Sequence, residues 1–133
     1  MSKVNRETAE KEIEQWLDFK KVGARKRESN KEFIEALIDA IVDGVLVIKS
    51  DTKVIVHNLK FPTDGEQPLT TLEYKPRISY SQVKGHLTNV KAGDGDGRFA
   101  AYMAALTGQP KAMFEKLDSE DYTIAQAISL FFI

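Results

Sequence analysis

The chain contains no cysteine, one tryptophan and two histidines. The absence of cysteine excludes a disulfide framework, a thiolate zinc site and a cysteine nucleophile. Neither His57 nor His86 has a potential metal ligand three or four residues away, so neither belongs to a metal-binding motif. We therefore expect no metal and no cofactor.

Long hydrophobic runs are also absent. No segment approaches the roughly 20 apolar residues that a membrane-spanning helix needs, and the opening MSKVNRETAEKEIEQW lacks the apolar centre of a signal peptide. The default expectation is a soluble intracellular protein that does not act at a membrane.

The charge is nearly balanced, with a net value of −1 at pH 7. Residues 1–31 carry nine basic and six acidic side chains, whereas residues 92–133 carry three basic and six acidic ones. This asymmetry is too small to indicate nucleic-acid binding by itself. With 133 residues, 42% of them hydrophobic, the chain is long enough for one domain with its own core.

Two helices are predicted at the start of the chain. Over residues 6–22 a thin apolar stripe has helical spacing, with Asn5 placed to cap the helix and Gly23 to end it. Over residues 30–43 the stripe is broader, and it comprises Phe33, Ile34, Leu37, Ile38, Ile41 and Val42. Ser29 and Glu32 have the spacing of a capping box at the start of this second helix, and Gly44 follows it.

The pattern then changes to short β-type runs. Residues 45–48, 54–59 and 71–75 are β-branched or alternating, and the segments between them are rich in turn formers. The prolines Pro62, Pro68 and Pro76 lie outside these runs, where no ladder donor is lost. A small antiparallel sheet is therefore predicted.

Short helices are predicted for the rest of the chain. Ser79 or Ser81 caps one that runs through about residue 89, and Asp94 or Asp96 caps the next, which ends at Gly108. A further short helix follows Pro110 and ends near residue 117. The last helix begins after the cap Asp118, with Glu120 and Asp121 at the positive end of its dipole.

The last helix is the candidate partner-binding element. The apolar residues at its end, Phe131, Phe132 and Ile133, need burial in the chain's own core or against a partner. The arc is wider than one stripe, so part of it is expected to face another protein. The predicted partner-binding residues are Tyr122, Ile124, Ile128, Leu130, Phe131 and Phe132.

Motifs that would carry chemistry are missing or incomplete. The run GDGDGR at residues 93–98 lacks the later ligands of a calcium-binding EF-hand loop and the Lys-Ser/Thr ending of a phosphate-binding loop. No serine lies in a G-x-S-x-G arrangement. We predict no catalytic residues and no enzymatic activity.

One basic segment leaves an alternative open. Residues 20–27, KKVGARKR, contain five Lys or Arg side chains between the two predicted helices, which would suit contact with a phosphate backbone. The simpler interpretation is a solvated connection, because acidic residues alternate through the preceding helix and the net charge is near zero. A small DNA-binding or regulatory module that uses this segment therefore remains an alternative hypothesis.

The order of motifs over residues 54–133 resembles a protein family. A strand pair leads into LKFP, and LTTLEYKPRIS, a short helix, VKAGDGDGR, a helix ending in LTGQP, and LDSEDYTIAQAISLFF follow. This order is similar to that of tail assembly chaperones of tailed bacteriophages, of the Mu-like and P2-like type. The helical region in front of it resembles an extension that only some relatives carry. A structural tail component is the remaining alternative hypothesis.

The resemblance implies a protein without catalytic activity that acts in the cytoplasm of the infected bacterial host. Such a chaperone coats the tape measure protein before the tail tube polymerises around it, and it is then displaced, so it is not expected in the mature virion. The implied partners are the tape measure protein, the tail tube protein and further copies of the chain in a homo-oligomer, without specific nucleic acid and without a membrane. Many relatives exist in two lengths through ribosomal frameshifting, and the ending SLFFI fits the short form.

The expected fold is α+β, with an N-terminal helical pair, a small antiparallel sheet and a C-terminal bundle of short helices. Residues 1–44 are the predicted helical extension, and residues 45–133 are the predicted chaperone-like domain. The two parts are expected to form one compact unit.

Overall fold

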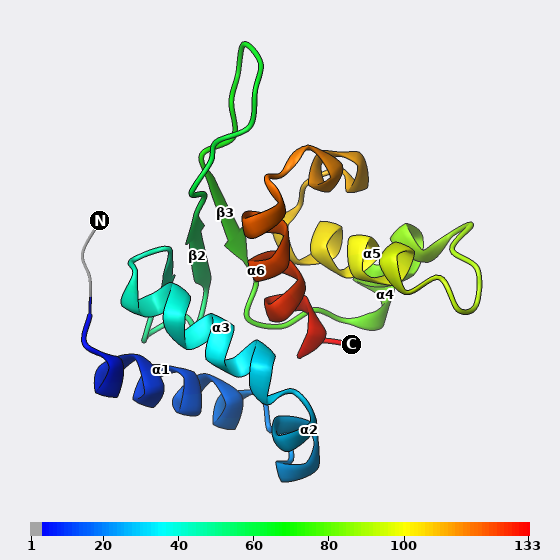
Figure 1. Cartoon of the computed structure of the whole chain (residues 1–133). Coiled ribbons are helices and arrows are strands. Elements are labelled where there is room, and N and C mark those ends of the chain that lie inside the picture. Colours follow the sequence, from blue (N-terminus) through cyan, green and yellow to red (C-terminus); the bar gives the residue numbers. More distant parts are fainter. Residues whose placement is uncertain (1–3) are drawn as a thin grey trace.

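The N-terminal third is helical, as Figure 1 shows for the computed structural model, which describes residues 4–133. Helices α1 (Arg6–Phe19), α2 (Ala24–Ser29) and α3 (Lys31–Val42) follow one another, and α1 lies beside α3. The broad apolar stripe of α3 buries Leu37, Ile38 and Ile41. The predicted helical pair is therefore present, with an additional short helix between its members.

Three short strands form the sheet. Strands β1 (Leu46–Ile48), β2 (Ile55–Asn58) and β3 (Thr71–Tyr74) pair antiparallel in the order β1-β2-β3. The register aligns Leu46 with His57 and His57 with Leu72, and all three side chains are buried on the inner face. The predicted antiparallel sheet and the α+β class are confirmed.

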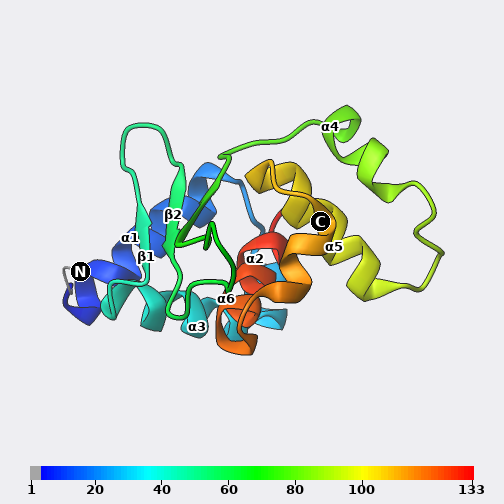
Figure 2. The same ribbon diagram turned by 90° about the horizontal axis from the view of Figure 1, so that it is seen from above.

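Further helices follow the sheet along the chain. They are α4 (Tyr80–Lys84), η1 (Gly85–Leu87), α5 (Gly95–Thr107), η2 (Lys111–Lys116) and α6 (Ser119–Leu130). Helix α6 packs against both α3 and α5, and from above it lies between the N-terminal helices and the α4–α5 side of the molecule (Figure 2). Small residues of α5 and α6, including Ala104 and Ala125, are buried in the same core.

One hydrophobic core joins the two parts of the chain that the sequence analysis distinguishes. Its members run from Ala9 in α1 to Phe131 after α6. Two arginines add ion pairs between the N-terminal helices: Arg6 pairs with Glu35 and Asp39 of α3, and Arg27 pairs with carboxylates of α1. The described part of the predicted extension, residues 4–44, therefore packs into the fold, while residues 1–3 lie outside the described residues.

The end of α1 differs from the prediction. The helix stops at Phe19 because Lys21 adopts a left-handed backbone with φ of 58°, and Val22 N donates to Leu17 O at 3.0 Å in the pattern of a Schellman motif. Gly23, predicted to close α1, instead occupies the N-cap position of α2. The basic segment 20–27 therefore contains a tight turn and the start of a short helix.

Four of the predicted helix N-caps are confirmed, including Asn5, which accepts from Thr8 N, and one is wrong. Asp94 accepts from Gly97 N, Asp118 accepts from Glu120 N, and Ser79 forms a capping box with Gln82. The predicted capping box at Ser29 is wrong, because Ser29 is the last residue of α2 and no side chain caps α3.

Two glycines offer a matched test of backbone conformation. Gly108, which ends α5, has a left-handed φ of 76°, whereas Gly85 is right-handed helical with φ of −61°, and a Cβ at either position would meet no atom within 4 Å. We expect Gly108→Ala to lower the free energy of unfolding by about 1–2 kcal/mol. Gly85→Ala should leave it unchanged or raise it by about 0.4–1 kcal/mol. Urea denaturation measures both, and equal effects would contradict the assignment of Gly108 as a left-handed cap.

Candidate functional site

The predicted partner-binding residues do not form one surface. Ile128, Phe131 and Ile124 are buried in the core of their own chain, with exposed fractions of 0%, 4% and 9%. Tyr122, at the start of α6, and Leu130 and Phe132, at its end, are partly exposed. The surface left for a partner is therefore divided between the two ends of α6.

The end of α6 contacts the end of α1 through aromatic rings. Trp16 meets Phe131 edge-on with ring centroids 5.8 Å apart, and Phe132 lies tilted against the same indole at 6.2 Å. Lys20 Nζ lies 3.2 Å from the centroid of the Phe132 ring, close enough for a cation–π contact. We call Trp16, Lys20, Phe131 and Phe132 the C-terminal aromatic cluster.

Charge and burial make this cluster unusual. Burial, together with the charges of the nearby cations Arg77 and Lys26, lowers the pKa of Lys20 to about 8. Within residues 4–133, the buried indole nitrogen of Trp16 has no hydrogen-bond acceptor. The cluster therefore combines well-packed rings with two polar groups, the Lys20 ammonium and the Trp16 indole N–H, whose removal from water is not fully offset by hydrogen bonds or opposite charge.

Tyr122, the partly exposed residue at the start of α6, lies apart from the C-terminal aromatic cluster. It lines an open groove of about 1060 Å³ between the loop before α5, η2 and the start of α6. Asp96 and Lys111 also line this groove, and Lys111 Nζ donates to His86 O at 2.7 Å. Partial burial and the charge of Asp96 raise the pKa of Tyr122, so it stays a neutral phenol.

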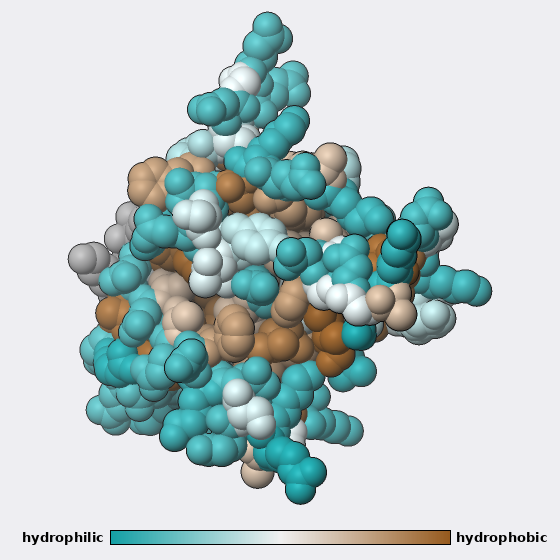
Figure 3. Space-filling model, turned by 45° about the vertical axis from the view of Figure 1, so that its right-hand side comes forward, coloured by the Kyte–Doolittle hydropathy of each residue, from teal (hydrophilic) through white to brown (hydrophobic). Residues whose placement is uncertain are grey.

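Hydrophobic residues also gather on the molecular surface. Figure 3 shows an apolar band across the middle of one face, at the height where Figure 1 places the C-terminus, with hydrophilic residues above and below it. The partly buried hydrophobic residues around the core include Phe33, Leu130 and Phe132. An apolar band with a polar border is typical of a surface that contacts another protein.

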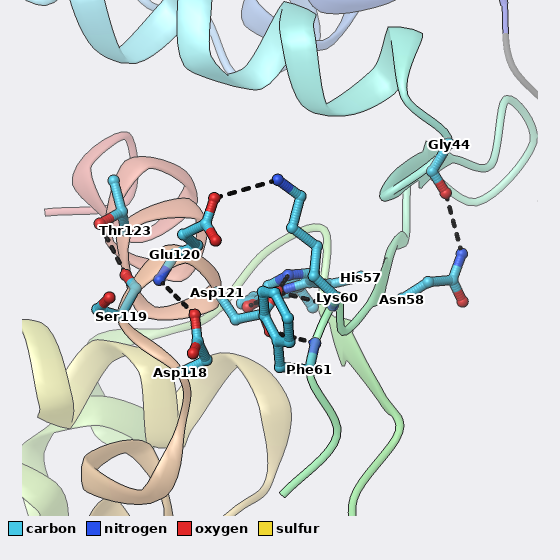
Figure 4. Close-up of polar contacts among 11 residues, drawn as sticks. Gly44, His57, Asn58, Lys60, Phe61, Asp118, Ser119, Glu120, Asp121 and Thr123 are labelled. Atoms are coloured by element: carbon cyan, nitrogen blue, oxygen red, sulfur yellow. Dashed lines mark hydrogen bonds and ion pairs between the residues drawn. The ribbon is translucent and has the colours of Figure 1, made fainter.

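A buried polar network lies at the other end of α6. Asp121 is fully buried and accepts hydrogen bonds from Lys60 N and Phe61 N, each at 3.0 Å, and its carboxylate lies 3.3 Å from His57 Nε2. Figure 4 shows this carboxylate pointing toward the segment that follows β2. The network joins α6 to the sheet and to the base of the loop over residues 59–70, which projects from the body in Figure 1.

The histidine continues the network to a tyrosine. His57 Nδ1 lies 3.0 Å from Tyr74 Oη, and burial lowers the pKa of His57 although Asp121 opposes this shift. The neutral ring then donates from Nε2 to Asp121 and accepts at Nδ1 from the Tyr74 hydroxyl. Burial also raises the pKa of Tyr74. These three groups have exposed fractions of 0%, so they cannot reach a substrate and act as a structural connection.

This network was missed by the sequence analysis. The sequence patterns place His57 only in a predicted strand and Asp121 only at the positive end of a helix dipole, and Asp121 does lie in the first turn of α6. The available signal was the two-residue period of a strand, which places His57 on the same face as the apolar residues Ile55 and Leu59. No local pattern indicated that Asp121 is its partner, 64 positions away.

Residues 4–133 contain no group of three or more His, Asp or Glu side chains placed to hold a metal ion. None of the helices in this described part has both the length and the apolar character needed to cross a membrane. No protein-family model, curated protein or solved structure matches the chain.

The importance of the buried carboxylate can be tested with two neighbouring residues. Asp121→Asn places an amide group where two backbone N–H groups need an acceptor, and we expect it to lower the free energy of unfolding by about 3 kcal/mol. Glu120→Gln removes the same charge from an exposed ion pair with Lys60 and should cost less than about 1 kcal/mol. Chemical denaturation of both variants is the measurement, and a similar small loss in both would show that the buried network contributes little.

The histidine of the network gives a pH dependence. Because the folded-state pKa of His57 lies below the ordinary value of 6.5, the unfolded chain takes up this proton first as the pH falls. The stability that neutral His57 contributes is fully present above pH 6.5 and is lost as the pH falls through 6.5 toward the folded-state pKa. The free energy of unfolding then falls by up to about 1.4 kcal/mol per pH unit. In His57→Gln the free energy of unfolding should fall less steeply between pH 7 and pH 5 than in the parent. His86→Gln should retain the parent slope, and a parent slope in His57→Gln would contradict the assignment.

Proposed function

We propose that the chain is a tail assembly chaperone of a tailed bacteriophage, which binds the tape measure protein without catalysing a reaction. The motif order over residues 54–133 supports this proposal, and the C-terminal aromatic cluster is the observation that carries it. Phe132 stays partly exposed while Trp16 and Phe131 beneath it are buried, so its ring is presented on a rigid base. The protein acts in the cytoplasm of the infected host and leaves before the virion is complete.

A surface of this kind suits a long helical partner. A tape measure protein exposes apolar stripes along its helices until the tail tube encloses them, and such stripes aggregate when uncovered. An aromatic side chain on a well-packed base contributes strongly to binding because little conformational entropy is lost on contact. The apolar band of Figure 3 is a further surface that suits the apolar stripe of a helix.

The two ends of α6 supply separate places for contact. Phe132 and Leu130 lie at the end of the helix, and Tyr122 lies in the groove at its start. One place is sufficient for the tape measure protein, and the other is free for a second copy of the chain or for the tail tube protein. Homo-oligomerisation is therefore part of the proposal.

The DNA-binding alternative receives less support. Arg27 pairs with Glu14 and Asp18, and Lys26 Nζ donates to Ile133 O at 2.9 Å. Among the five cations of residues 20–27, Lys21 and Arg25 are the exposed ones. Two exposed charges neutralise few phosphates, which is compatible only with weak binding to duplex DNA.

The proposal predicts different effects for one substitution at two aromatic positions. Phe132→Ser should leave the protein folded and weaken capture of a tape measure fragment about tenfold or more. Phe61→Ser removes an aromatic ring that is 50% exposed on the projecting loop and should leave capture unchanged. Ile128→Asp introduces a charge into the core and should prevent folding, at a cost of several kcal/mol.

Pull-down with a purified fragment and light scattering measure capture and self-association. Circular dichroism establishes that the two serine variants are folded. If Phe132→Ser is folded and captures the fragment as well as the parent does, the C-terminal aromatic cluster is core packing and the proposed function loses its site.

A further inference from the structure

Three cations surround the C-terminal aromatic cluster and come from separate parts of the chain. Lys20 follows α1, Lys26 belongs to α2, and Arg77 follows β3. In the described part of the chain, none of the three forms an ion pair with a carboxylate side chain, whereas Arg6 and Arg27 each form at least two. Positive charge is therefore concentrated beside Phe132, and among the described residues none of these three cations is paired with an acidic side chain.

This concentration of charge costs folding free energy. Arg77 and Lys26 lie close enough to Lys20 to disfavour its charged form, in addition to the effect of its own burial. The Lys20 ammonium is placed over the Phe132 ring, and Lys26 uses the carbonyl oxygen of Ile133 as an acceptor. Cations held together beside a partly exposed ring form a site that anionic groups would stabilise.

We propose that this surface binds an acidic segment of the partner protein, with carboxylates paired to Lys20 and Arg77 and an apolar side chain packed on Phe132. The inference rests on the proposed function, since it names the chemistry of the segment that the aromatic cluster receives. Charge complementarity sets the rate and the selectivity of such an encounter, while the ring supplies the apolar contact.

A peptide fits the site better than a nucleic acid does. The cationic surface is small, and α1 beside it carries the exposed carboxylates Glu14 and Asp18. A phosphodiester backbone that continues past the cluster would meet these acidic groups and would gain few counterion-releasing contacts. A short acidic segment with one apolar side chain places its carboxylates near the cations and its apolar side chain on the Phe132 ring.

The test measures binding of short labelled peptides to the full chain by fluorescence anisotropy. One peptide contains glutamate and leucine, a second has glutamine in place of every glutamate, and a labelled oligothymidylate is the third probe. We expect the glutamate peptide to bind more tightly than the other two and to weaken as salt is added.

Two double variants with the same change in net charge separate the site from general electrostatics. Lys20→Gln with Arg77→Gln removes two cations of the cluster, and Lys49→Gln with Lys84→Gln removes two exposed cations elsewhere. We expect the first pair to weaken binding of the glutamate peptide about tenfold. The second pair should change it by less than about twofold.

Each other outcome overturns the inference. Equal binding of the glutamate and glutamine peptides, or equal losses in the two double variants, shows that the cluster does not select acidic segments. Tighter binding of oligothymidylate with the same dependence on Lys20 and Arg77 assigns the surface to nucleic acid instead. Capture of the tape measure fragment by the Lys20 and Arg77 double variant is measured in parallel. If this variant captures the fragment normally while Phe132→Ser does not, the proposed function stands and only the acidic character of the bound segment is rejected.

Discussion

The buried carboxylate of Asp121 is the constraint on which much of the fold depends. A charge removed from water is tolerated only when donors surround it, and here the donors come from two other parts of the chain: His57 in β2 and the backbone of Lys60 and Phe61 after it. Burial of Asp121 therefore fixes the start of α6 against the sheet and fixes the direction in which the projecting loop leaves β2. The tyrosine that follows in the network, Tyr74, extends the same connection to β3.

With its start held in this way, α6 crosses the core and brings its end to α1. Small side chains let α5 approach one face, and Ile128 fills the centre with no exposed surface. The last turn then meets Trp16, so the rings at the end of the chain pack against a helix formed by its first twenty residues. The C-terminal aromatic cluster is thus a consequence of long-range packing, and the N-terminal helices form part of the candidate binding surface.

Local signals were sufficient for most of the fold and insufficient for the site. Some helix ends depend on interactions with residues only a few positions away, as at Asp94, Asp118 and Gly108. The sequence therefore predicts those boundaries well. Lys21 has a left-handed backbone conformation that glycine usually adopts. A rule that ends helices at glycine therefore places the end of α1 too late. The pairing of His57 with Asp121 and the meeting of Lys20, Arg77 and Phe132 depend on tertiary packing, which no spacing rule in one sequence contains.

Charged groups at the two ends of α6 differ in how they are compensated. At its start a buried carboxylate is satisfied by donors, and this arrangement contributes to a single well-defined packing. At its end Lys20 is partly desolvated, repelled by Arg77 and Lys26, and left with an aromatic face as its counterpart. Lys26 donates to Ile133 O, but among the described residues no acidic side chain is paired with any of the three cations. Retaining that charge beside a partly exposed ring is the expected arrangement for a surface whose compensation comes from a binding partner.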